Sequence, residues 1–360
     1  MSFSDIWKKI TEAPSYRPAR INIPADHADI GSRLQMPFIK NETYFVVRIN
    51  ELFLSYSRKW FSTYDPVVFV TTEFIYNAEK FAVPFVVGPT MMSNKMDRLP
   101  EGMIFQDTAV AGLHPYRGGN FILSIVLGRI RQENYLRKFI GIVEKAAATY
   151  TGGFATVVSS YAKVANVVLD GMETLFNNED VDPLIGCRKE FMQQALDEFN
   201  SGYFLLMNTE EKNIDESKFF VKNNKLFYGD SLQDAKPFRD ADYVLYSIIA
   251  APRRDDIELL PFHTQFLQLQ SYISDIPTTI SKEQGDIINA KRYKLQDTIR
   301  MSADLVRPQV KEVITDYDAE LKEMIDERHA LSGEEKVSAD KRDDWEKEMD
   351  AQAWNILYKK

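Results

Sequence analysis

Cys187 has the clearest potential for chemistry in this sequence, because it is the only cysteine and an arginine follows it. The helical period of residues 188–199 predicts that Cys187 lies where a helix begins. A helix N-terminus and the neighbouring Arg188 would both lower the pKa of the thiol and favour the nucleophilic thiolate. With His114 as the candidate base, one hypothesis is a thiol-dependent hydrolase. The alternative is that Cys187 is a small, buried hydrophobic side chain.

Other reactive arrangements are missing from the sequence. The four histidines are scattered, and no pair of histidines or cysteines has the spacing of zinc ligands. The acidic loop of residues 177–182 offers oxygen atoms to calcium but lacks the EF-hand pattern, so we interpret it as a solvated loop. There is no glycine-rich phosphate-binding motif and no nucleophile elbow, and Gly152-Gly153 is typical of a turn between helices. The sequence therefore predicts no metal and no cofactor.

The turn of residues 113–119 contains the densest cluster of unusual side chains, with Tyr116 and Arg117 between a proline and a glycine. An arginine beside an aromatic ring is a common recognition pair at protein interfaces. Tyr116 and Arg117 are therefore candidate partner-binding residues. The same sequence is also typical of a structural turn that joins two strands.

The composition limits the classes of protein that this chain can belong to. With 360 residues, of which 44% are hydrophobic and 12% aromatic, the chain can bury a sizeable core. The single cysteine fits a reducing compartment, and the first ten residues lack the apolar segment of a secretory signal, so we expect a cytoplasmic protein. The net charge of −9 and the lack of a basic cluster argue against binding to nucleic acid.

The longest stretch of low charge, residues 151–169, is interrupted by Ser159, Lys163 and Asn166. A membrane-spanning helix needs about 20 predominantly apolar residues, so these interruptions favour a buried helix over a membrane span. A further alternative function is a membrane-active effector, in which residues 154–176 leave the body of the protein and insert into a bilayer.

Short runs of β-branched and aromatic residues between Pro and Gly turns predict strands on both sides of a helical insertion. The expected fold class is α+β: an antiparallel, sandwich-like sheet with a helical insertion, followed by an all-helical C-terminal region. Pro84 predicts an edge strand or a bulge, and Asn223-Asn224 predicts a tight hairpin turn. The expected strands cover residues 43–53, 67–76, 81–87, 103–110, 120–130, 203–207, 219–221, 226–228 and 243–249, and the expected helices of the insertion cover 133–148, 154–172 and 188–199.

Three parts of the chain follow from this pattern. We expect an extended N-terminal arm over residues 1–40, a mixed body over 41–254 and a helical region over 255–360. In the helical region, apolar residues from Leu259 to Ile276 recur at spacings of three and four, and a second helix is expected over 282–306. A third helix is expected to carry Val310, Ile314, Tyr317, Leu321 and Met324 on one face.

The last 50 residues are dense in charge, with 15 acidic and nine basic side chains. Trp345, Met349 and Ile356 share one stripe of an expected last helix, and Trp354 lies within the same segment. Large aromatic side chains anchor protein interfaces when they insert into pockets, so these four residues are candidate partner-binding residues. The alternative is that the tryptophans pack against the chain's own body.

Residues 114–148 combine the run HPYRGGNFILSIVLGRI with the helical run ENYLRKFIGIVEKAA. This combination resembles strand-then-helix modules in uncharacterised components of multi-gene bacterial defence and signalling systems. The resemblance includes no catalytic signature and implies no residue roles.

The leading hypothesis is a non-enzymatic assembly component. The body would be a structural scaffold, and the helical C-terminal region would bind a protein partner or a second copy of the chain. The absence of catalytic motifs and the heptad-like apolar spacing support this hypothesis over the hydrolase and the membrane-active effector.

Overall fold

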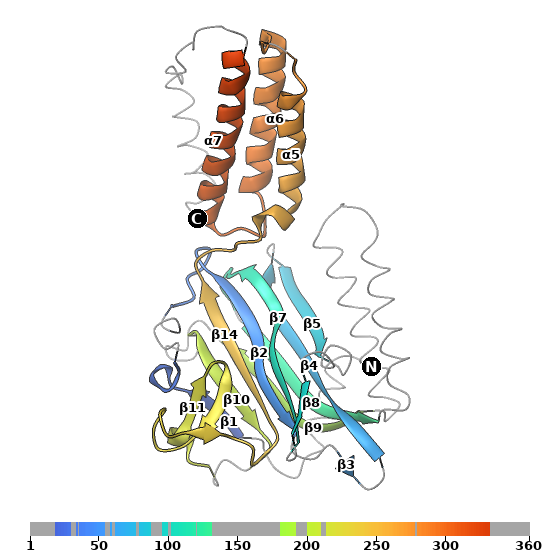
Figure 1. Ribbon diagram of the computed structural model, residues 1–360, viewed down its shortest axis with the longest axis vertical. Helices are drawn as coiled ribbons and strands as arrows, with labels where there is room; N and C mark the ends of the chain where they lie inside the picture. The colour runs from blue at the N-terminus through green and yellow to red at the C-terminus, as the bar shows by residue number, and fades with distance from the viewer. Residues whose placement is uncertain are drawn as a thin grey trace. The chain divides into compact units, whose positions relative to one another are not determined.

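The computed structural model shows an antiparallel α+β protein, which confirms the expected fold class (Figure 1). It describes residues 19–29, 34, 36–54, 58–59, 62–76, 79–87, 96–99, 102–119, 121–131, 181–191, 200–209, 214–277 and 279–331. The predicted helices over 133–148 and 154–172, the glycine turn between them and the last helix of the chain lie outside these residues.

The largest sheet of the described chain has six strands, all of them antiparallel to their neighbours. Their order is β1 (Ala19–Ile23), β10 (Gly202–Met207), β14 (Tyr243–Ala251), β2 (Tyr44–Leu54), β7 (Gly102–Pro115) and β6 (Met96–Leu99). The central strands β14 and β2 are buried almost throughout, as expected for strands that are covered on both faces.

The second sheet packs against the first and contains β3 (Arg58–Lys59), β4 (Ser62–Tyr76), β5 (Glu79–Val87), β8 (Phe121–Arg131) and β9 (Val181–Phe191). Strand β4 lies between β5 and β8, and β9 pairs with β8. In the described chain β5 pairs with β4 alone, which confirms that the strand containing Pro84 is an edge strand.

A small third sheet consists of β11 (Phe219–Lys222), β12 (Lys225–Tyr228) and β13 (Lys236–Pro237). Asn223 and Asn224 join its first two strands with φ angles of 51° and 61°. Two successive positive φ angles define a type I′ turn, which asparagine tolerates better than most residues. The predicted hairpin turn is therefore confirmed. Three short 3-10 helices also occur, at Ala25–His27, Glu216–Lys218 and Ile257–Leu259.

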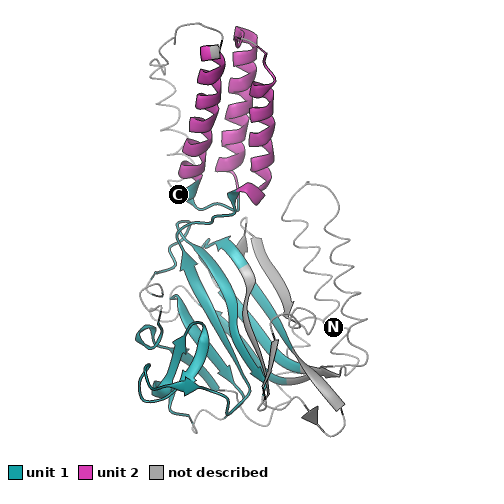
Figure 2. Ribbon diagram, viewed as in Figure 1, with its two compact units in different colours: residues 1–257, 303–309 teal, residues 258–302, 310–360 magenta. Residues whose placement is uncertain are grey.

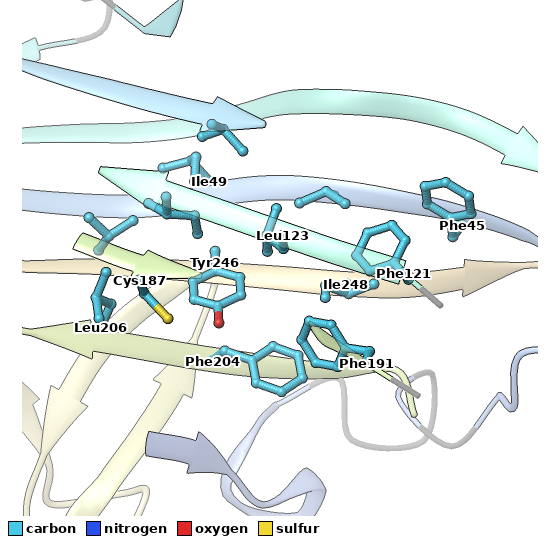
Figure 3. Packing of buried hydrophobic residues seen from close by; sticks show 14 of the residues in the cluster. Phe45, Ile49, Phe121, Leu123, Cys187, Phe191, Phe204, Leu206, Tyr246 and Ile248 are labelled. Carbon is cyan, nitrogen blue, oxygen red and sulfur yellow. The ribbon is translucent and has the colours of Figure 1, made fainter. Parts of the chain in front are cut away.

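Two hydrophobic cores lie on opposite faces of the six-stranded sheet. The first core fills the space between the two large sheets and includes Phe45, Phe121, Cys187 and Tyr246 (Figure 3). The second core lies between the six-stranded sheet and the small sheet, and includes Phe53, Phe219 and Tyr243. Because alternate residues of a strand point to opposite faces, neighbouring residues of β14 and β10 supply both cores.

Three helices follow the strands: α5 (Pro261–Ser274), α6 (Lys282–Arg300) and α7 (Arg307–Leu331). Ser281 begins α6 with a capping box, in which its hydroxyl accepts from the amide of Gln284 and the Gln284 side chain accepts from the amide of Ser281. The second helix, expected over 282–306, ends at Arg300 instead. Beyond this end, the carbonyl oxygens of residues 303–305 accept from the side chains of Arg117 and Arg254 and not from a further turn of helix.

The chain forms two compact units (Figure 2). The body contains residues 1–257 and 303–309, and the helical unit contains residues 258–302 and 310–360. Residues 303–306 of the connection between α6 and α7 and the first three residues of α7 therefore belong to the body, whereas α6 and the rest of α7 belong to the helical unit. Residues 19–23, which were expected in an extended arm, form edge strand β1 of the body.

Candidate functional site

Cys187 lies in the middle of strand β9, opposite Ile125 of β8, and not at the start of a helix. The expectation of a helix from residue 188 is wrong up to Phe191, where β9 ends, and residues 192–199 are not described. The thiol is buried in the first core, whereas Arg188 points to the opposite face and pairs with Glu73 at 3.3 Å. Burial raises the pKa of Cys187, although Arg20 and Lys189 partly oppose this effect. The environment therefore favours the unreactive thiol.

His114 lies on β7, opposite Phe45 of β2. Its ring centroid is 4.7 Å from that of Phe74 and 5.8 Å from that of Phe45. Loss of hydration, together with the positive charge of the nearby Arg254, lowers the pKa of His114 to about 4. His114 is therefore neutral at physiological pH.

The structure does not bring the two candidate catalytic residues together. Cys187 neighbours Tyr246 and Leu206 at one end of the first core, whereas Phe45, against which His114 packs, lies at the other end (Figure 3). The geometry thus provides no nucleophile–base pair in this part of the molecule.

Tyr116 and Arg117 are both held within the body. Tyr116 is buried, with its ring edge against Phe38 at 5.8 Å, and its backbone exchanges hydrogen bonds with residues 41 and 43. Gly118 and Gly119 continue the turn with φ angles of 79° and 81°, which glycine adopts without strain. These observations favour the structural turn over the recognition pair, and the partner-binding role of Tyr116 and Arg117 stays a prediction.

Arg117 fixes the segment of residues 303–309, which we call the anchor loop. Its guanidinium donates to the carbonyl oxygens of Ala303 at 2.9 Å and Leu305 at 3.1 Å. It also donates to Oδ1 of Asn41 at 3.1 Å. Asn41 has a positive φ of 64°, and its carbonyl oxygen accepts from the amide of Arg307 at 3.0 Å. Arg117 and Asn41 thus bond to the anchor loop at Ala303, Leu305 and Arg307.

Arg254 contacts the anchor loop at Asp304 and at Gln309. It forms a two-point ion pair with Asp256, at 2.6 and 2.8 Å, and donates to the carbonyl oxygen of Asp304 at 3.1 Å. The buried Gln309 side chain bonds to the backbone of Arg254, and Tyr44 Oη donates to Gln309 Oε1 at 2.6 Å. Burial raises the pKa of Tyr44 to about 12, so its hydroxyl stays protonated and can donate.

A second buried polar network surrounds Glu51, which the sequence pattern did not single out. Glu51 Oε2 accepts from the amide of Leu226 at 2.7 Å and from Tyr243 Oη at 2.8 Å. Its other oxygen lies 3.3 Å from the guanidinium of Arg239. These bonds attach the small sheet to β2 and β14. Burial raises the pKa of Glu51, although the three partners oppose this effect.

The helical unit has its own polar contacts between helices. Arg292 of α6 pairs with Asp318 of α7 at 2.7 and 3.0 Å, and Gln296 donates to the same carboxylate at 2.8 Å. Tyr317 of α7 stacks on Phe266 of α5 with a centroid distance of 3.7 Å. Its hydroxyl lies 2.7 Å from Nδ1 of His263. These contacts define how the three helices align within the unit.

Exposed large hydrophobic side chains concentrate in the helical unit. Among the residues whose side-chain exposure the structure describes, six such side chains have exposed fractions between 38% and 82%. Only Ile39 lies in the body. The other five lie in α5 and α6 or next to their ends: Leu259, Leu267, Ile287, Tyr293 and Met301. The apolar residues that were expected to recur at spacings of three and four are buried from Phe262 to Ile276. Leu259, the first of them, is exposed instead.

Trp345, Met349, Trp354 and Ile356 lie outside the described residues, as does most of the acidic loop of residues 177–182. Within the described chain, no group of three or more His, Cys, Asp or Glu side chains could hold a metal ion. No helix in that same part of the chain is long and apolar enough to cross a membrane. The predicted membrane-active segment, residues 154–176, lies outside the described residues.

These features define an α+β protein with a β-sheet body that has two cores and a unit in which three helices are described. Comparison with known proteins gives no match to a family model, a curated protein or a solved structure.

Proposed function

We propose that this protein is a non-enzymatic assembly component, in which the body is a structural scaffold and the helical unit binds a protein partner. The distribution of exposed hydrophobic side chains carries this proposal. Where side-chain exposure is described, five of the six large ones lie in the helical unit, although the body supplies most of the residues compared. Single exposed hydrophobic residues are normal on a protein surface, but their concentration in one unit is typical of an interaction surface.

Two edge strands of the body support the helical unit as the binding unit, because these strands carry features that discourage pairing with a strand of another chain. Strand β9 contains Pro183 and the inward-pointing Lys189, whose ammonium lies 5.0 Å from the ring centroid of Phe191. Strand β5 contains Pro84. Proline and inward-pointing charge are common protections of edge strands. Assembly through the helical unit is therefore favoured over assembly through these edges. A cytoplasmic location is a separate part of the proposal.

Light scattering after size exclusion, together with quantitative co-purification from the native host, tests the proposal. The test variant replaces Leu259, Leu267, Ile287, Tyr293 and Met301 with serine, and Ile39→Ser is the matched control in the body. Circular dichroism establishes that both variants are folded. We expect the wild-type chain to form a stoichiometric assembly that the five-site variant loses and the control keeps. A wild-type chain that assembles with nothing, or equal loss in both variants, overturns the proposal.

A further inference from the structure

Helix α5 exposes a face that carries no charge. None of its 14 residues is Asp, Glu, Lys or Arg, although these four types make up 27% of the chain. Its buried side chains face α6 and α7, and the residues opposite them are Thr264, Leu267, Gln268 and Ser271, all of them exposed. We call these four residues the α5 face. The water-facing side of a surface helix is normally rich in charge, whereas charge is depleted at the centre of interfaces.

An acidic stripe on α7 borders the α5 face. Gln270 of α5 donates to Glu320 of α7 at 3.2 Å, which places Glu320 on the side of α7 next to α5. Residues three or four positions apart lie on the same side of a helix. The stripe therefore consists of Asp316, Glu320, Glu323 and Glu327, which are all exposed and follow one another at spacings of three or four residues, about one turn of helix.

The alignment of α5 with α7 is fixed by contacts near both ends of α5. His263 and Tyr317 are hydrogen-bonded near one end, and Arg328 donates to the carbonyl oxygen of Ser274 at 2.7 Å at the other. In both pairs the α7 residue lies 54 positions after its α5 partner. The two helices therefore run side by side in the same direction. The acidic stripe consequently follows the α5 face along its length.

We propose that the α5 face and the acidic stripe together form the docking surface for a cationic amphipathic helix of a partner protein. The apolar side of such a helix would pack around Leu267, and its lysines or arginines would lie against the stripe. The inference rests on the proposed function and names the partner of the same helical unit. Charge complementarity selects this occupant over a second copy, which would bring a second acidic stripe and a second net charge of −9.

Fluorescence anisotropy with labelled helical peptides tests the inference on the full-length protein. Two peptide sets share the same leucine-rich side and differ only in flanking residues, lysine in one set and glutamate in the other. We expect lysine-flanked peptides to bind at least about tenfold more tightly than their glutamate-flanked counterparts, with a difference that shrinks at high salt. In the variant with Asp316, Glu323 and Glu327 all replaced by lysine, we expect this preference to reverse.

Leu267→Asp should weaken binding of the lysine-flanked peptides about tenfold or more, because it places a charge at the centre of the docking surface. The matched control is Asp326→Lys, a charge reversal on another side of α7, which should leave binding within about twofold of wild type. Equal binding of both peptide sets, no binding of either, or no reversal in the triple variant overturns the inference.

Light scattering of the assembly from the native host, with wild type and with Leu267→Asp, distinguishes failure of this inference from failure of the proposed function. If the wild-type chain assembles through the helical unit but Leu267→Asp assembles normally, the docking surface is wrong and the proposed function survives. If light scattering shows a wild-type dimer that Leu267→Asp disrupts, the occupant is a second copy and the cationic helix is excluded. If the wild-type chain assembles with nothing, the proposed function itself fails.

Discussion

The carboxamide of Gln309 brackets the backbone of Arg254. Its Nε2 donates to the carbonyl oxygen of Arg254 at 2.6 Å, and its Oε1 accepts from the amide of the same residue at 3.1 Å. A single side chain thus replaces the two bonds that a neighbouring β-strand would provide at this position. The bracket holds the end of the anchor loop at the point where the chain leaves the last strand of the body.

Replacement of Gln309 by methionine should lower the free energy of unfolding by about 2–4 kcal/mol. Methionine has a similar shape, but it leaves the buried amide and carbonyl of Arg254 without this partner and removes the acceptor of Tyr44. Urea denaturation followed by circular dichroism measures the change. The matched control is Gln268→Met on the exposed side of α5, which should change stability by less than about 0.5 kcal/mol. Equal effects of the two substitutions would show that the bracket contributes no net stability.

Glu51 should make the stability of the body depend on pH. Burial raises its folded pKa above the ordinary value of 4.5, so folding favours the protonated form. The contribution of Glu51 to the free energy of unfolding is fully present below the pKa that this carboxyl has in the unfolded chain. It decreases as the pH rises through the pKa of the folded state. Glu51→Gln stays neutral throughout. We therefore expect the stability of Glu51→Gln relative to wild type to increase between pH 4.5 and neutral pH, as measured by urea denaturation at each pH.

A stability difference between Glu51→Gln and wild type that is constant with pH, or that falls as the pH rises, would contradict this assignment. Glu51→Ala provides the second comparison. Alanine leaves the amide of Leu226 and the hydroxyl of Tyr243 without an acceptor, so this variant should be less stable than Glu51→Gln at every pH by about 1–3 kcal/mol.

Cys187 should react more slowly than a free thiol. Its buried position and its raised pKa both reduce the amount of accessible thiolate. We expect iodoacetamide at neutral pH to label the folded protein at least about tenfold more slowly than free cysteine, and to label the urea-unfolded chain at the ordinary rate. Labelling of the folded protein that is faster than that of free cysteine would contradict the buried assignment and revive the thiol-dependent hydrolase.

The sequence pattern was reliable where local chemistry decides the structure. Alternating and β-branched runs placed the strands, and Asn223-Asn224 identified the hairpin turn because few other residue pairs tolerate its two positive φ angles. Pro84 marked an edge strand for a similar reason, since proline cannot donate to a second neighbour.

The pattern was unreliable where tertiary structure decides. The run around Cys187 has apolar residues at both helical and strand spacings, and pairing with β8 selects the strand. Glu51 was missed because the pairing of β2 with β14 shifts register at Leu245 and Tyr246, next to Glu51. Such a bulge changes which residues face the core, so strict alternation places Glu51 on the wrong side. The bonds of Arg117 to the anchor loop join positions 186 and 188 residues apart, a separation that no local pattern reveals.

Tyr317 should be the most sensitive position of the helical unit, because it combines a stacked ring with a hydrogen bond across the helices. Its ring lies on Phe266, and its hydroxyl bonds to His263. Tyr317→Phe keeps the stacking and should cost about 1 kcal/mol, whereas Tyr317→Ala removes both contacts and should cost about 3–5 kcal/mol. Thermal denaturation monitored at the helical circular dichroism band measures both changes. Equal losses for the two variants would assign the stability to the hydrogen bond, and no loss for alanine would exclude α5–α7 packing as the basis of the helical unit.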